Sequence, residues 1–275
     1  MTRTALTAAP RLRIDSLKLL RMTGIAWFWA ALAGQAMFAI FIGLQYVVSA
    51  AIGDTARMDE RVGFGFVAGD LLGNAMFAAH VLLAFVITVG GPVQLIPKLR
   101  NKFRIFHRWN GRIYVAVALL ISVSALVLIW TRGALGGVPF FVGNNINAAL
   151  VIVCAIMTLR MAQARKFDAH RRWAMRLFIA ACGVWFIRLG FGFWALATGF
   201  QMPGMHSDLT GEYDRFLAIA HTTLPLAMLE LYFFAQRRAE AAVRLPMAAL
   251  LVAATLFTAI GSVGATIIFW LPSLL

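Results

Sequence analysis

Seven long apolar runs constrain the fold of this chain more than any other feature of its sequence. Crossing the hydrocarbon of a bilayer takes about 20 apolar residues in a helix. Lipid offers no hydrogen bonds to an open backbone, so runs of this length indicate helices. The sequence predicts an all-α polytopic membrane bundle of about seven transmembrane helices. The expected spans lie at about residues 24–52, 75–96, 112–131, 146–163, 174–199, 216–236 and 245–272.

The composition supports lipid as the solvent for much of the surface. Of the 275 residues, 61% are hydrophobic and only 13% are charged, and the mean hydropathy is +0.81. A soluble domain carries about 25% charged residues. We therefore expect one seven-helix transmembrane domain over residues 24–275, which follows a basic cytoplasmic N-terminal segment over residues 1–23.

The charges of the loops predict the orientation of the bundle. Twenty basic residues fall on the N-terminal segment and on the second, fourth and sixth loops, whereas four fall on the remaining loops. Loops rich in Lys and Arg stay in the cytoplasm. We predict a multi-pass protein of a bacterial inner membrane, with its N-terminus inside and its C-terminus outside. The net charge of +14 then reflects topology and contact with anionic lipid, not binding to nucleic acid.

Four histidines fall at suggestive places in the predicted spans. We expect His80 and His221 at equal depth inside the second and sixth helices. His107 and His170 match in depth near the inner edge, just before the third and fifth helices. Two pairs at matching depth, each divided between helices, suit axial ligation of two b-type haems. Alternatively, each imidazole bonds a neighbouring helix or faces lipid headgroups.

Two charged residues lie inside predicted spans, Arg188 in the fifth and Glu230 in the sixth. An unpaired charge at mid-bilayer costs about 2.5 kcal/mol or more, so such residues usually face a partner or a cavity. We expect Arg188 to offset a haem propionate or to hold a quinol headgroup, and Glu230 to relay a proton. Their direct pairing would need long side chains or helix tilt. We also expect Gly183, Gly190 and Gly192 to leave room for a macrocycle.

The third and fifth spans begin with similar short motifs. Residues 107–112 and residues 170–176 both place His-Arg before a Trp, and both have an Arg three residues after that Trp. An internal parallel repeat explains the similarity. The frequency of Trp and Arg at membrane interfaces explains it equally well.

These motifs form part of a longer pattern that runs from His80 through Gly90, Gly91, Gln94, Leu99 and Arg100 to the segment 106–114. The pattern resembles bacterial DUF2306 membrane proteins. Residues 170–176, with Arg188 downstream, are similar to the second signature of that family, and the likeness covers roughly residues 70–235. The family is named for a domain of unknown function, so the resemblance implies the topology and these residues without an activity.

A more distant likeness is to the di-haem transmembrane b-type cytochromes, which pass electrons from ascorbate or quinol across a membrane. Those proteins have six spans rather than seven, and their histidines have different spacings. The first functional hypothesis is accordingly a b-type cytochrome-like oxidoreductase that holds haem b and exchanges electrons with quinol or another small redox molecule. The alternatives are a small-molecule transporter or channel lined by Arg188 and Glu230, and a non-catalytic membrane sensor or assembly factor.

Overall fold

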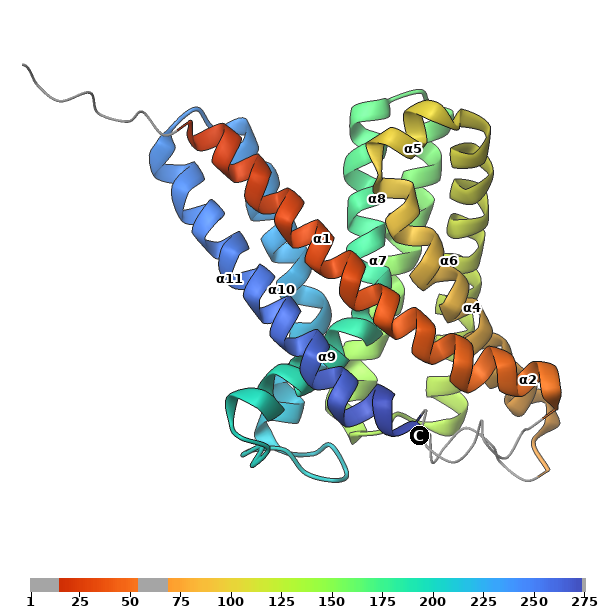
Figure 1. Ribbon diagram of the computed structural model, residues 1–275. Coiled ribbons are helices and arrows are strands. Elements are labelled where there is room, and N and C mark those ends of the chain that lie inside the picture. The colour runs from red at the N-terminus through yellow and green to blue at the C-terminus, as the bar shows by residue number, and fades with distance from the viewer. Residues whose placement is uncertain (1–14, 54–68, 274–275) are drawn as a thin grey trace, which may run out of the picture.

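Helices account for all of the regular structure in residues 15–53 and 69–273, the part of the chain that the computed structural model describes (Figure 1). Six helices are long and apolar enough to cross a membrane, and a bent helix pair makes a seventh crossing if it counts as one span. The predicted all-α bundle is confirmed. Its elements are α1 (Ser16–Ile42), η1 (Gly43–Val48), α2 (Ser49–Ile52), α4 (Leu71–Leu95), α5 (Pro97–Lys102), α6 (Arg104–Arg132), α7 (Gly137–Gln163), α8 (Phe167–Ala181), α9 (Gly183–Ala197), α10 (Glu212–Arg237), α11 (Ala241–Ala265), η2 (Thr266–Trp270) and η3 (Leu271–Ser273).

The predicted charge asymmetry distinguishes the two ends of this bundle. The basic end holds the start of α1, the short helix α5 and the turns at residues 164–166 and 238–240. The opposite end holds the long loop at residues 198–211, and the chain finishes there (Figure 1). Several residues behind the orientation prediction lie outside the described residues, namely residues 1–14, Asp54, Arg57, Asp59, Glu60 and Arg61.

Two helices begin eight residues earlier than the apolar runs predict. The first span begins at residue 16 rather than 24, and the third begins at residue 104 rather than 112. Asp15 caps α1, because its carboxylate accepts hydrogen bonds of 3.1 Å from the amides of Leu17 and Lys18. Arg and Lys are good helix formers, so these helices continue past the apolar residues. As a result, His107 lies inside α6 and not before it. The fifth span likewise begins at residue 167 rather than 174, so His170 also lies inside its helix.

The fifth predicted span is broken in two, which the sequence did not predict. Helices α8 and α9 meet at Cys182 with an angle of 54° between them. The amide of Asn147 on α7 donates a 2.8 Å hydrogen bond to the carbonyl of Ala180, next to the break. Glycine at position 183 lets Asn147 approach this closely, because a Cβ there would lie 2.6 Å from Asn147 Nδ2. Asn147 therefore supports the bend from a neighbouring helix.

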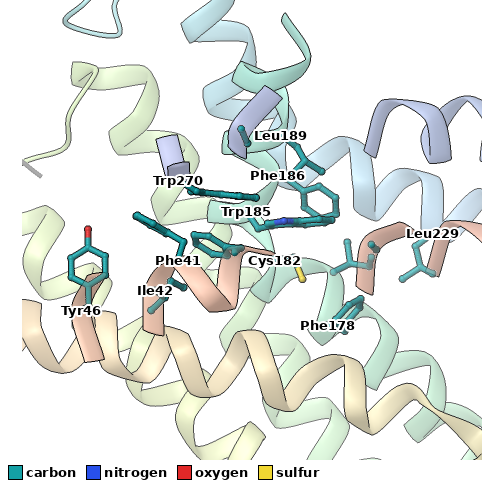
Figure 2. Close-up of a cluster of buried hydrophobic side chains, with 14 of the residues drawn as sticks. Phe41, Ile42, Tyr46, Phe178, Cys182, Trp185, Phe186, Leu189, Leu229 and Trp270 are labelled. Carbon is teal, nitrogen blue, oxygen red and sulfur yellow. The ribbon is translucent and has the colours of Figure 1, made fainter. Parts of the chain in front are cut away.

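The helices form two groups that diverge at the basic end (Figure 1). Helices α4, α6, α7 and α8 pack in one group, and α1, α9, α10 and α11 pack in the other, with α10 joined to α7. An aromatic core fills the junction nearer the opposite end. Figure 2 shows Phe41 from α1, Trp185 from α9 and Trp270 from η2 in this core. Burying such large rings supplies much of the packing between the two groups.

Candidate functional site

The four histidines occupy equivalent positions in their helices. His80 is the tenth residue of α4 and His221 is the tenth of α10, both counted from the opposite end. His107 is the fourth residue of α6 and His170 is the fourth of α8, both counted from the basic end. Within each pair the two histidines therefore lie equally far along their helices, at 1.5 Å per residue. We call His80 and His221 the outer pair, and His107 and His170 the inner pair.

Hydrogen bonds set the protonation of both outer histidines. His80 Nδ1 lies 2.9 Å from Ser124 Oγ, and that hydroxyl donates its only hydrogen to the carbonyl of Ile121. The serine can then only accept, so the hydrogen is on His80 Nδ1. His221 Nδ1 lies 3.1 Å from the carbonyl of Leu217 and must likewise donate. In the neutral imidazoles, both Nε2 atoms therefore keep a free lone pair.

The outer pair differs in its surroundings. His221 is only 3% exposed and lies beside α7 and α9, where a Cβ added at Gly143 or Gly183 would contact its ring. His80 faces α6. Helices α4 and α10 share α8 as a neighbour. Side chains of Asn147 and His221 fill the space beside Gly183, so this glycine does not leave room for a macrocycle as predicted.

The inner pair lines one large cavity of about 1520 Å³ that reaches into the bundle from the basic end. His170 Nδ1 donates across 3.0 Å to the carbonyl of Thr158, so its Nε2 also keeps a lone pair. His107 from α6 and His170 from α8 therefore line the same cavity, and their pairing as ligands stays a prediction.

The mouth of this cavity is strongly basic. Gln94 also lines it and donates a 3.1 Å hydrogen bond to the carbonyl of His107, which ties α4 to α6. The buried hydroxyl of Tyr114 has no hydrogen-bond partner in the described part of the chain. Among the residues that the structure describes, Asp168 is the one acidic residue that lines the cavity. Five arginines line it: Arg100, Arg104, Arg108, Arg112 and Arg171.

Arg188 and Glu230 do not pair with each other and do not line this cavity. Arg176 instead binds Glu230 through two hydrogen bonds of 2.6 and 2.9 Å. The guanidinium of Arg188 lies over the ring of Phe38 at 5.1 Å and donates to the carbonyl of Val184. Within residues 15–53 and 69–273, no carboxylate lies at ion-pair distance from Arg188. The idea that both residues line a transport cavity receives no support from their positions.

The other two glycines expected to make room for a macrocycle are also closely packed. A Cβ at Gly192 would overlap the backbone of α11 at Gly261 and Ala265, so this glycine lets two helices cross closely. A Cβ at Gly190 would meet the side chain of Leu217 at 2.5 Å. That expectation is therefore wrong for Gly190 and Gly192, because helix packing already fills the space beside them.

The two similar sequence motifs also adopt similar local structures. The Arg112 guanidinium lies 5.1 Å from the Trp109 ring, and Arg176 lies 4.7 Å from the Trp173 ring. Each is a cation–π contact between residues three apart on a helix. In both motifs the histidine of the inner pair comes shortly before the tryptophan.

A comparison with protein families finds a match over part of the chain. Residues 77–207 match the DUF2306 family of predicted membrane proteins. This match confirms the resemblance seen in the sequence, and it establishes a membrane protein. The DUF2306 match contains His80, His107, His170 and Arg188, whereas His221 and Glu230 lie beyond it. No curated protein and no solved structure matches the chain.

Several contacts of the site could not be found from the sequence. The side chains of Ser124 and Asn147 hold His80 and the α8–α9 bend, and the backbone carbonyl of Thr158 holds His170. Serine and asparagine are common in membrane helices, where they bond many kinds of partner, and every residue has a backbone carbonyl. No local signal distinguishes these three groups from others in the spans.

Proposed function

We propose that the chain is a b-type cytochrome-like membrane electron carrier, with one haem b between His80 and His221 and another between His107 and His170. One observation supports this most: the four histidines fall in two pairs at matching positions along their helices, and three of them keep an Nε2 lone pair. Axial ligation of haem iron by histidine uses that nitrogen as a lone-pair donor. The inner pair also lines the large cavity, whereas His80 and His221 do not, so the fit to haem b is better for the inner pair.

The surrounding residues have definite parts in this proposal. Ser124, Leu217 and Thr158 accept the Nδ1 hydrogens, which fixes each ring and raises the basicity of Nε2. The arginines at the mouth of the cavity offset propionate charge near the inner pair. Bound haem supplies reversible one-electron transfer. Pairs near both ends of the bundle suit electron transfer across the membrane, with a quinol or another small redox molecule as partner.

The proposal is tested by a reduced-minus-oxidised visible spectrum of protein purified in detergent from a haem-replete host. We expect the spectrum of a bis-histidine b-type haem. H80A and H107A should each remove part of it, because each breaks a different pair. H206A is the control, since His206 lies in the loop at the opposite end and in neither pair. A colourless wild-type protein rules the proposal out.

A further inference from the structure

The cavity at the basic end combines two surfaces that a haem alone does not need. Near the mouth it is lined by five arginines from α5, α6 and α8. Deeper in, its lining is apolar and includes Phe186 from α9, Leu224 from α10, and Leu251 and Phe257 from α11. Its volume of about 1520 Å³ exceeds the roughly 300–1,000 Å³ of most small-molecule pockets. A second ligand therefore has room beside the inner pair.

The five arginines lack carboxylate partners in the described residues, since no Asp or Glu lies within ion-pair distance of any of them. Arg104, Arg108 and Arg112 follow one another along α6 over about 12 Å. Cations gathered beside an apolar wall repel one another, because a low dielectric strengthens their interaction. An anion between these arginines removes that repulsion.

The length of the apolar part indicates that the anionic group belongs to a ligand with a hydrocarbon chain. Thr258 of α11 lines the cavity, and it lies 17 residues beyond the start of that helix at the basic end. At 1.5 Å per residue the lining extends about 25 Å along α11, which is most of the length that a helix needs to cross a hydrocarbon layer of about 30 Å. A free phosphate ion would occupy only the basic part of the cavity and leave its apolar part empty. A ligand with a hydrocarbon chain fills it.

We infer that this cavity binds an anionic phospholipid, with its phosphate among the arginines of α5, α6 and α8 and its chains against α1, α10 and α11. Arginine is well suited to phosphate, since its planar fork donates two parallel hydrogen bonds. The inference goes beyond the proposed electron transfer and does not depend on it.

Binding is measured by native mass spectrometry of the detergent-solubilised full chain, with phosphatidylglycerol as the probe and phosphatidylcholine as the neutral comparison. R104Q/R108Q removes two arginines that line the cavity. R165Q/K166Q makes the same change of charge at the same end, on residues that do not line it. We expect the first variant to bind phosphatidylglycerol roughly thirtyfold more weakly, and the second to match wild type.

Three outcomes overturn the inference. The first is equal loss in both variants, which indicates general surface charge. The second is equal binding of the two lipids, and the third is full displacement of phosphatidylglycerol by an equal concentration of glycerol phosphate. A further variant, H107A/H170A, separates this claim from haem binding. The H107A/H170A variant should still bind phosphatidylglycerol. Loss of lipid binding in this variant contradicts the claim that the arginines bind lipid independently of haem.

Discussion

Ser124 controls the protonation of His80 through a single contact, although it lies 44 residues away in the sequence. Partners of this kind orient a ligand, and their loss typically lowers metal affinity by about 10- to 100-fold. We expect S124A to lower the haem affinity of the outer pair by roughly tenfold, as measured by haem retention on dilution. S122A on the same helix is the control, and equal retention in both variants contradicts the role of Ser124.

Asp70 gives the protein a pH-dependent stability. Its carboxylate accepts hydrogen bonds from Arg132 and from the amide of Gly73, which hold its pKa below the ordinary value of 3.8. A depressed pKa stabilises the folded state above pH 3.8, and this stability is lost as the pH falls toward the folded-state value. D70N should therefore lower the melting temperature at pH 7, and the difference should shrink below pH 4. A constant difference from pH 3 to pH 7 contradicts this linkage.

Arg176 and Glu230 form an ion pair on the partly exposed side of α8 and α10. Their side chains are 21% and 49% exposed, so solvent or headgroups weaken the attraction. A double-mutant cycle with R176Q and E230Q should give a coupling free energy of about 1 kcal/mol in thermal unfolding. Strictly additive effects show instead that the pair contributes nothing to stability.

Among the helices, the crossing of α9 over α11 depends on glycine. A Cβ at position 192 overlaps the backbone at Gly261 and Ala265, which cannot move away as a flexible side chain can. G192A should lower the free energy of unfolding by about 1–3 kcal/mol. G111A is the matched control, because the nearest atom is 3.7 Å from the added methyl group. Alanine at position 111 should leave the free energy of unfolding unchanged or raise it slightly. Equal changes in the two variants contradict the claim that the crossing requires glycine at position 192.

The helices themselves follow from the sequence, whereas the bend in the fifth span does not. Long apolar runs have one solution in lipid, so all seven spans are predictable. The break at Cys182 depends on Asn147, which is 35 residues earlier in the chain and on another helix. The early start of α6 places His107 inside a helix. A search for apolar runs stops at charged residues, although arginine is a good helix former, so it misses this first part of α6.

For the whole molecule, the sequence predicts which helices carry the histidines but not the cavity. The assignment of a residue to a span depends only on the apolar runs, so it holds even where the helix boundaries shift. The cavity depends on how far the two helix groups diverge, and that divergence depends on many contacts between distant residues. Glu230 illustrates the difference, since its span was predictable and its partner Arg176 was not.

The most direct test of the central claim is the number of haems per chain, measured by pyridine haemochrome on the purified protein. The account predicts two haems in the wild type and one in either H80A or H107A, because each variant disables one pair. H206A should retain two. A ratio of zero in wild-type protein from a haem-replete host contradicts the account and leaves all four histidines as helix-packing or interfacial residues.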